Sequence, residues 1–275
     1  MVYHPVRLLV SDVDGTLVRH DKSLAPATIA AVERLRHAHV AMTLISARPP
    51  SGILPLARAL GLDTPIGAFN GGTIVAPDGS IVAAYRLDAG VSHKAIALVE
   101  ASGASPWAFA DGQWFARDAD NPHNNSERRA AMIEPLITGD FATLHGRIDK
   151  IVGVSDDPAL IAKLEADAKA ALGDGAMVSC SQTYYCDITH PLANKGDGIL
   201  ALAKAIGVPL TETAAIGDMP NDIPMLTRAA LGIAMGQAPD AVKAVAREVT
   251  SSNEEDGVAA AITRFLLPEV ARHRL

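Results

Sequence analysis

The most informative stretch of the chain reads Ser11-Asp12-Val13-Asp14-Gly15-Thr16-Leu17, and it follows the apolar run Val6–Val10. The run predicts a buried strand, and the glycine predicts a turn at its end. Side chains two positions apart in a strand point the same way, so both carboxylates can converge on one point. One of them can attack phosphorus while the other moves a proton, and a cation offsets their repulsion. The alternative is an Asp-Gly turn with a spare surface aspartate.

Composition limits the class of protein. The chain has 275 residues, which predicts two domains or one large one, and 49% of them are hydrophobic. A net charge of −7 without a basic run argues against nucleic-acid binding. No apolar run reaches about 18 residues, so we expect no membrane partner. Met1–Pro5 does not resemble a signal peptide, and the two cysteines are too few for a disulfide scaffold, so we expect a cytoplasmic protein.

Strand and helix patterns alternate in the N-terminal part of the chain. They predict a strand at Val6–Val10, a helix at Ala27–Ala38, a strand at Val40–Ile45, a helix at Gly52–Leu60 and a strand at Pro65–Phe69. This order indicates a parallel sheet with helices on its faces. Ligands gather at the carboxyl ends of such strands, which is where the polar candidates lie. These candidates are Asp12, Asp14, Ser46 and Asn70.

The middle of the chain has a different pattern. Thr73–Val75 and Ile81–Tyr85 flank Asp78-Gly79, which predicts a hairpin, and further strands and helices alternate up to Thr189. From Lys195 the first pattern resumes. We therefore expect an α/β fold whose doubly wound, Rossmann-like parallel-sheet core covers residues 1–83 and 190–275. An inserted α/β cap with an antiparallel sheet is expected over residues 84–189.

Four polar clusters follow one another in the chain: Asp12/Asp14, Ser46, Lys195 and Gly217-Asp218-Met219-Pro220-Asn221-Asp222. In this order they resemble the motifs of the haloacid dehalogenase-like (HAD) phosphatases, and in particular the Cof-type hydrolases with a type IIB cap. About thirty residues separate Asp14 from Ser46, and about 150 separate Ser46 from Lys195. The large cap therefore belongs in the second gap. The resemblance covers essentially the whole chain.

The resemblance implies a set of catalytic residues. Asp12 is expected to be the nucleophile that forms an aspartyl phosphate, and Asp14 the acid and then the base. Ion-pumping relatives carry Thr at the position of Asp14, so Asp14 favours a hydrolase. Ser46 and Lys195 are expected to hold the phosphoryl oxygens. The alternatives are a helix cap before Pro49 for Ser46 and a solvated helix start for Lys195.

The same resemblance implies a metal site. Asp218 is expected to bind the ion directly and Asp222 directly or through water, with Asp12 and Asp14 in the same site. Two such carboxylates 4 Å apart repel by ~4 kcal/mol at an effective dielectric constant near 20, and a divalent cation removes that cost. Ligands that are all oxygen favour Mg²⁺ over zinc, so Mg²⁺ is the expected cofactor.

Substrate contacts are expected both around the motifs and in the cap. Those near the motifs are Gly15, Thr16, Ala47, Arg48, Asn70, Gly71, Asn194 and Asn221. For Asn194, capping of the following helix is an equal alternative. Candidates in the cap are Trp107, Trp114, His123, Tyr184 and Tyr185, which otherwise belong to the cap's own core or to a hairpin surface.

The expected function is Mg²⁺-dependent hydrolysis of a small phosphorylated metabolite, with a sugar phosphate as the first candidate. A phosphosugar mutase or another phosphotransferase is the alternative, and a non-catalytic phospho-ligand-binding protein is a third. A mutase would need several arginines in the cap, and those present form no motif: Arg117, Arg128, Arg129 and Arg147. We expect a monomer or a homodimer. The sequence does not identify the leaving group.

Overall fold

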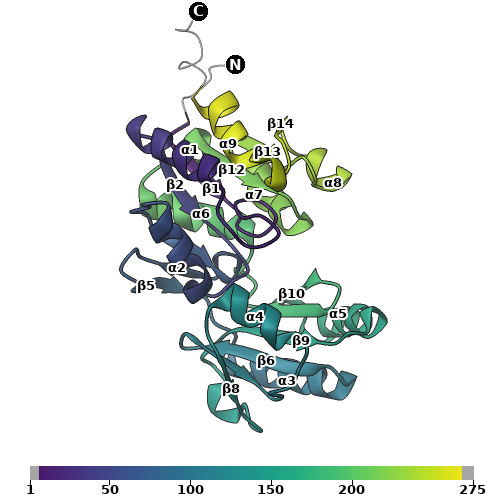
Figure 1. Ribbon diagram of the computed structural model, residues 1–275. Helices are drawn as coiled ribbons and strands as arrows, with labels where there is room; N and C mark the ends of the chain where they lie inside the picture. Colours follow the sequence, from purple (N-terminus) through teal and green to yellow (C-terminus); the bar gives the residue numbers. More distant parts are fainter. Residues whose placement is uncertain (1–5, 268–275) are drawn as a thin grey trace, which may run out of the picture.

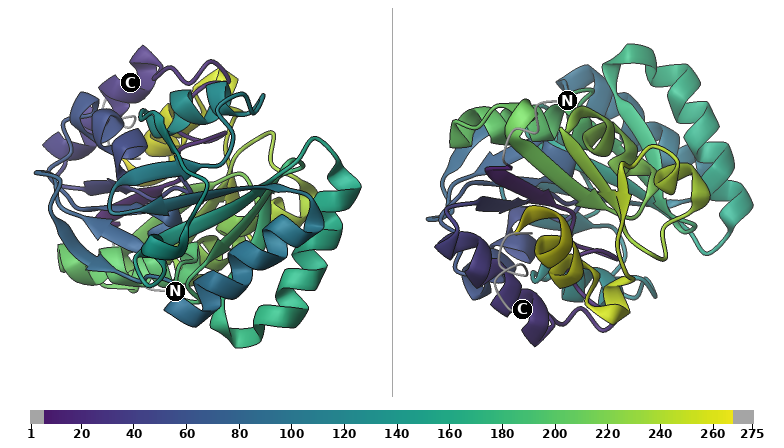
Figure 2. Two further views of the ribbon diagram at one scale, coloured as in Figure 1. Left: turned by 90° about the horizontal axis from the view of Figure 1, so that it is seen from below. Right: turned by 90° about the horizontal axis from the view of Figure 1, so that it is seen from above.

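A five-stranded parallel sheet forms the centre of the computed structural model, which describes residues 6–267 (Figure 1). Its strand order is β14-β13-β12-β1-β2. The bounds are Leu8–Ser11 (β1), Ala41–Leu44 (β2), Thr213–Gly217 (β12), Leu231–Ala234 (β13) and Glu248–Val249 (β14). Segments far apart in sequence thus lie side by side, with β1 between β2 and β12 (Figure 2). The expectation for Met1–Pro5 lies outside the described residues.

Helices cover both faces of this sheet. The α1 side includes α9, and the opposite side carries α6 and α7. Successive residues of β1 serve the two faces, because Leu9 packs on the α1 side while Leu8 and Val10 pack on the α6 side. The bounds are Pro26–His37 (α1), Pro50–Ala59 (α2), Lys195–Ile206 (α6), Ile223–Arg228 (α7), Asp240–Lys243 (α8) and Gly257–Ala261 (α9). The predicted doubly wound parallel-sheet core is confirmed.

A separate three-stranded antiparallel sheet corrects one prediction. It contains β3 (Ile66–Ala68), β4 (Thr73–Val75) and β5 (Ile81–Ala84), which confirms the predicted hairpin. The strand predicted at Pro65–Phe69 does not join the parallel sheet, which it touches through a single bridge from Gly67 to Ile45. The reason is local, since the chain reverses right after β3, with positive φ at Asn70 and Gly71, and sends β4 back beside it.

The middle of the chain builds a six-stranded sheet of order β10-β11-β9-β6-β7-β8, antiparallel except between β7 and β8. The strands are Ser105–Ala110 (β6), Gln113–Ala116 (β7), Pro135–Ile137 (β8), Ile148–Val154 (β9), Met177–Gln182 (β10) and Tyr185–Thr189 (β11). Helices α3 (Ala89–Ser102) and α5 (Pro158–Leu172) cover one face. We call the opposite face of β6, β7, β9 and β11 the inner face, because its apolar side chains join the hydrophobic cluster of the parallel-sheet lobe.

Contacts from the inner face and from α4 join this lobe to the rest of the protein. The ring of Phe109 lies 5.7 Å from that of Phe69, and α4 (Asn124–Ala131) packs on α2, where the Ser51 hydroxyl donates to the carbonyl of Ala131 at 2.5 Å. The two chain segments that enter and leave this lobe also touch, since Tyr85 stacks on His190 with centroids 5.4 Å apart. The predicted domain boundaries at residues 83/84 and 189/190 stay a prediction.

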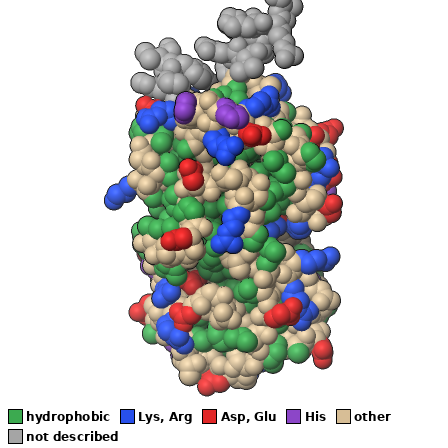
Figure 3. Space-filling model, turned by 60° about the vertical axis from the view of Figure 1, so that its left-hand side comes forward, with side chains coloured by type: hydrophobic (Ala, Val, Ile, Leu, Met, Phe, Trp, Pro, Cys, Tyr) green, Lys and Arg blue, Asp and Glu red, His purple; other side chains and the backbone are tan. Residues whose placement is uncertain are grey.

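Strand β5 lies on the side of the molecule that Figure 3 brings forward. Hydrophobic side chains gather across the middle of this face. Ile81 and Val82 of this edge strand are more than half exposed, at 54% and 58%. Charged side chains of both signs are scattered around this area. Among the helices within residues 6–267, none has the length and apolar content that a membrane crossing needs.

Candidate active site

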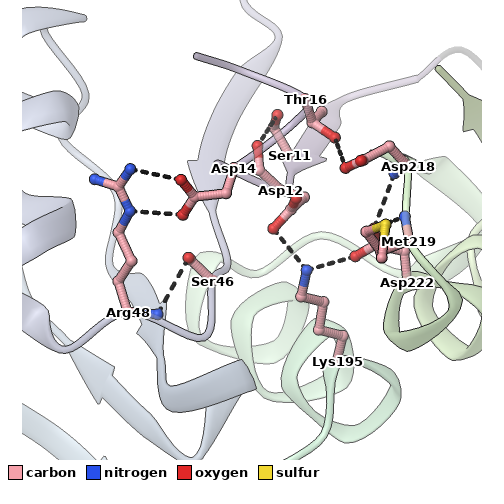
Figure 4. A network of polar contacts seen from close by, with 10 residues as sticks. All are labelled: Ser11, Asp12, Asp14, Thr16, Ser46, Arg48, Lys195, Asp218, Met219 and Asp222. Atoms are coloured by element: carbon pink, nitrogen blue, oxygen red, sulfur yellow. Dashed lines mark hydrogen bonds and ion pairs between the residues drawn. The ribbon is translucent and has the colours of Figure 1, made fainter. Parts of the chain in front are cut away.

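A buried lysine joins two carboxylates at the carboxyl end of the parallel sheet (Figure 4). Lys195, the first residue of α6, donates from Nζ to Oδ1 of Asp12 at 2.6 Å and to Oδ1 of Asp222 at 2.5 Å. Its side chain is only 2% exposed, so the solvated alternative for Lys195 is wrong. Burial alone lowers the pKa of Lys195, but the two carboxylates outweigh it and raise that pKa above its usual value.

Asp218 directly follows β12, the neighbour of β1, and lies beside Asp222 in Figure 4. Its Oδ1 accepts the hydroxyl proton of Thr16 at 2.8 Å. Gly15 has φ of +77°, and a Cβ atom there would lie 2.4 Å from Oδ2 of Asp218. Glycine is therefore required at this turn both for its backbone angle and for the close approach of the carboxylate. Thr16 and Gly15 position Asp218.

Asp12, Asp218 and Asp222 form the one group of possible metal ligands within residues 6–267, with oxygens within 4.8 Å of one another. All three side chains are buried, and burial together with the neighbouring carboxylates raises the pKa of Asp12 and brings that of Asp218 to about 6. Three carboxylates face one ammonium, so a divalent cation would balance the charge, and oxygen ligands suit Mg²⁺. The backbone amides of Asp218 and Met219 both donate to Oδ2 of Asp222. The carboxylates of Asp12 and Asp218 therefore have more free lone pairs for a cation than that of Asp222.

Asp14 does not belong to that group, which corrects its expected place among the metal ligands. Its carboxylate forms two hydrogen bonds of 2.7 Å with Nε and Nη2 of Arg48, and Lys22 donates to it at 2.7 Å. Burial raises the pKa of Asp14, but Arg48 and then Lys22 outweigh burial and lower it to about 2. Asp14 is therefore an ionised carboxylate at neutral pH. Arg48, which was expected to contact the substrate, forms an ion pair with Asp14 instead.

Ser46 lies after β2, between the Asp14–Arg48 pair and Lys195 (Figure 4). It does not cap α2, because that helix begins after Pro49 and shows no side-chain cap, so the alternative reading of Ser46 is wrong. Its Oγ accepts from the amide of Arg48 at 3.2 Å, and its carbonyl accepts from the amide of Asn70 at 2.7 Å. The Oδ1 atom of Asn70 is buried without a hydrogen-bond partner among the described residues.

The remaining residues predicted near the motifs have mainly structural surroundings. Asn194 caps α6, because its Oδ1 accepts from the amide of Asp197 at 3.0 Å, so the capping alternative holds. A Cβ at Gly71 would lie 2.4 Å from Cα of Gly198, which explains the glycine by close packing. Asn221 is exposed, and Ala47 offers its carbonyl to Lys150 at 3.3 Å.

Aromatic residues of the cap divide into two groups. Trp107 and Trp114 are fully buried with centroids 4.9 Å apart, so they build the inner-face core. His123 stacks on Tyr184 at 4.3 Å, and both are half-buried, while Tyr185 is buried.

Sequence reasoning missed the charged residues of the inner face and of α4, namely Lys150, Asp187 and Glu127. The available signal for the two strand residues was charge inside apolar strands: Asp149 and Lys150 in Ile148–Val154, and Asp187 in Tyr185–Thr189.

Comparison with known proteins decides the family. A family model described as haloacid dehalogenase-like hydrolase matches residues 9–262. The chain is a haloacid dehalogenase-like hydrolase. It is 27% identical to a pyridoxal phosphate phosphatase of Escherichia coli over 278 residues, covering 95% of this chain and 99% of the relative. It is 28% identical to an HMP-PP phosphatase of Cronobacter sakazakii over 232 residues, covering 84% and 85% of the two chains.

Solved structures agree with this HAD assignment. A crystal structure of a haloacid dehalogenase-like hydrolase from Bacteroides thetaiotaomicron superposes with a TM-score of 0.86 at 27% identity, covering 94% of this chain and 99% of that one. The resemblance stated from the four clusters is confirmed, and with it the expectation of an enzyme. The protein is a HAD-like phosphatase.

Proposed function

We propose that this HAD-like phosphatase is an Mg²⁺-dependent phosphomonoesterase that acts through an aspartyl phosphate at Asp12. The observation that carries the proposal is the buried group in which Lys195 bonds Asp12 and Asp222 beside Asp218. Asp12 and Asp218 would hold Mg²⁺, which supplies positive charge against the phosphoryl oxygens when bound. The named relatives act on small phosphorylated metabolites, and we extend that substrate class to this chain.

The first half of the reaction uses Asp12 as nucleophile. An Oδ atom of Asp12 forms a bond to phosphorus as the bond from phosphorus to the leaving oxygen breaks, and that oxygen takes a proton from Asp14. Lys195 and Ser46 donate to the phosphoryl oxygens, where positioned donors stabilise developing charge. In the second half, water gives a proton to Asp14 and attacks phosphorus, which releases phosphate and restores Asp12.

The ion pair between Asp14 and Arg48 must change before Asp14 can donate a proton in the first half of the reaction. With both hydrogen bonds in place the pKa of Asp14 is about 2, so Asp14 is ionised and has no proton to donate to the leaving oxygen. A bound phosphate offers Arg48 an alternative bidentate partner. We infer that the substrate phosphate draws Arg48 away from Asp14, which raises the pKa of Asp14 and lets it carry the proton. This gives Arg48 the substrate contact expected from the sequence.

A phosphate-release assay tests the proposal. With an aryl phosphate and Mg²⁺, we expect turnover that EDTA abolishes and that added Mg²⁺ restores. Asp12→Asn should lower turnover by many orders of magnitude, whereas Asp174→Asn, on an exposed residue of the cap, should leave it unchanged. Absence of phosphate release from a broad phosphomonoester panel, or near-normal turnover of Asp12→Asn, would overturn the proposal.

A further inference from the structure

Two charged residues lie together on the inner face of the cap. Lys150 of β9 and Asp187 of β11 are 6% and 2% exposed, and their Nζ and Oδ1 atoms lie 3.8 Å apart, too far for a hydrogen bond. Neither oxygen of Asp187 accepts a hydrogen bond within residues 6–267. The hydroxyl of Tyr185, two residues before Asp187 and on the same face, also has no partner there. Buried polar atoms rarely lack a hydrogen-bond partner, so we infer that a ligand supplies hydrogen bonds to this group.

A second carboxyl group, that of Glu127, comes from helix α4. Glu127 is 8% exposed, and its pKa is raised by burial, lowered by Lys150 and raised by Asp187 and Asp14. Helix α4 packs on α2, and α2 begins two residues after Arg48, the partner of Asp14. Glu127 therefore belongs to the part of the cap that docks on the segment next to the Asp14–Arg48 pair.

Lys150 connects this group to the catalytic lobe. Its Nζ donates to the carbonyl of Ala47 at 3.3 Å, and Ala47 directly follows Ser46. Asn70 is held to Ser46 by the bond from its backbone amide to the serine carbonyl, and its side-chain Oδ1 is buried without a partner among the described residues. We infer that a leaving group attached to a phosphoryl group at Ser46 has Lys150 as its neighbour on the cap side, with Asp187 next to it.

The oxygens of this group are hydrogen-bond acceptors, so they favour a ligand that donates hydrogen bonds. Oxygen atoms come from Asp187, Glu127 and Asn70. The one ammonium group, that of Lys150, lies near Asp187 and has two carboxyl groups to balance, those of Asp187 and Glu127. Hydroxyl or amine hydrogens satisfy such oxygens, whereas an added anion is repelled by the carboxylates with little screening in a buried site.

We propose that Asp187, paired with Lys150 and supported by Glu127, selects substrates by the charge of their leaving group. It accepts an uncharged leaving group with at least two hydroxyl or amine donors and rejects one that carries a second phosphate or a carboxylate. This rests on the proposed function, because it places the transferring phosphate at Asp12. It also separates the phosphatase from a mutase, which has to bind a sugar bisphosphate.

Binding of two non-hydrolysable analogues tests the proposal in the presence of Mg²⁺. The probes are the phosphonate analogues of a hexose 6-phosphate and of a hexose 1,6-bisphosphate, and calorimetry gives their dissociation constants. The wild type should bind the monophosphonate at least about tenfold more tightly than the bisphosphonate. Asp187→Asn should bring the two constants to within about threefold of each other by weakening the first and strengthening the second.

Control variants keep the outcome decisive. Glu127→Gln removes a second carboxyl group of the site and should shift the ratio in the same direction, which covers the case in which Asp187→Asn fails to fold. Asp167→Asn, on an exposed residue of α5, should leave the ratio as in the wild type. A wild type that binds the bisphosphonate as well as the monophosphonate, or that binds neither, overturns the proposal. An unchanged ratio in both site variants overturns it too. Phosphate release from an aryl phosphate, whose leaving group carries no second anion, reports separately on the proposed function.

Discussion

Replacing Lys195 by methionine removes a buried cation that holds two carboxylates together. Both Oδ1 atoms bond the same Nζ at 2.6 and 2.5 Å, so these oxygens of Asp12 and Asp222 can be no more than about 5 Å apart. At an effective dielectric constant of 20, two such charges repel by about 3 kcal/mol. This agrees with the roughly 3–5 kcal/mol lost when one partner of a buried ion pair is removed. A loss of that size lowers the melting temperature by on the order of 10 °C.

Thermal unfolding in EDTA at pH 7.5 measures this effect, and Lys163→Met provides a matched control. Lys163 is exposed and pairs with Asp167 one helical turn away, an arrangement worth only ~0.3–0.5 kcal/mol. Mg²⁺ should restore part of the stability of the Lys195→Met protein, since binding at 100 times the dissociation constant adds ~2.7 kcal/mol.

Lowering the pH should reduce the difference in free energy of unfolding between Lys195→Met and the wild type. Burial raises the pKa of Asp12, a member of the repelling pair, and raises that of the neighbouring Asp218 to about 6, both above their values in the unfolded chain. The folded state therefore takes up protons first as the pH falls from about 7 to 4, and each proton removes one of the repelling charges. A Lys195→Met protein within about 1 kcal/mol of the wild type in EDTA, or no less stable than Lys163→Met, would refute the role of Lys195 as counter-ion.

Three further predictions concern the surroundings of this group. Arg48→Met should raise the pKa of Asp14 in the free enzyme above about 2 and move the acid limb of the pH profile of kcat/KM, which reports on the free enzyme, upward; an unmoved limb would contradict the ion pair. Gly15→Ala places a Cβ 2.4 Å from Oδ2 of Asp218, so the Mg²⁺ concentration for half-maximal activity should rise by about tenfold. Asn194→Ala should lower the free energy of unfolding in urea by ~1 kcal/mol through loss of the helix cap, with an unchanged KM. A raised KM would instead place this amide on the substrate.

Local sequence signals could predict the catalytic group because each member lies next to an element boundary. Asp12 and Asp218 directly follow buried strands, and Lys195 begins a helix, so the pattern of apolar residues marks their positions. Parallel strands bring their carboxyl ends to one edge, which makes the convergence of these residues predictable. The sheet to which Pro65–Phe69 belongs could not be predicted in this way. A three-residue strand carries too little pattern, and its partner depends on the reversal at Asn70.

Side-chain partners were harder to predict than positions. Arg48 was expected to face the substrate, but it lies on Asp14, and nothing in the local pattern selects one anion over the other. Lys150 and Asp187 stand out as charges within apolar strands, yet whether they face α5 or the catalytic lobe depends on which side of the cap sheet docks. That is a property of the tertiary packing of two lobes and not of either strand.

The position of β1 between β2 and β12 also constrains the order in which the chain can fold during synthesis. One edge of β1 stays without its neighbour until Thr213–Gly217 has been made, after the whole inserted segment. The six-stranded sheet has all its partners between Ser105 and Thr189, so it can form first. Long-range parallel pairing is slow, and an unpaired edge invites aggregation while it waits. A ribosome that stalls between Thr189 and Thr213 would therefore hold a complete cap sheet beside a β1 strand that lacks its β12 neighbour, and Asp12 gains its counter-ion only after Lys195 has been made.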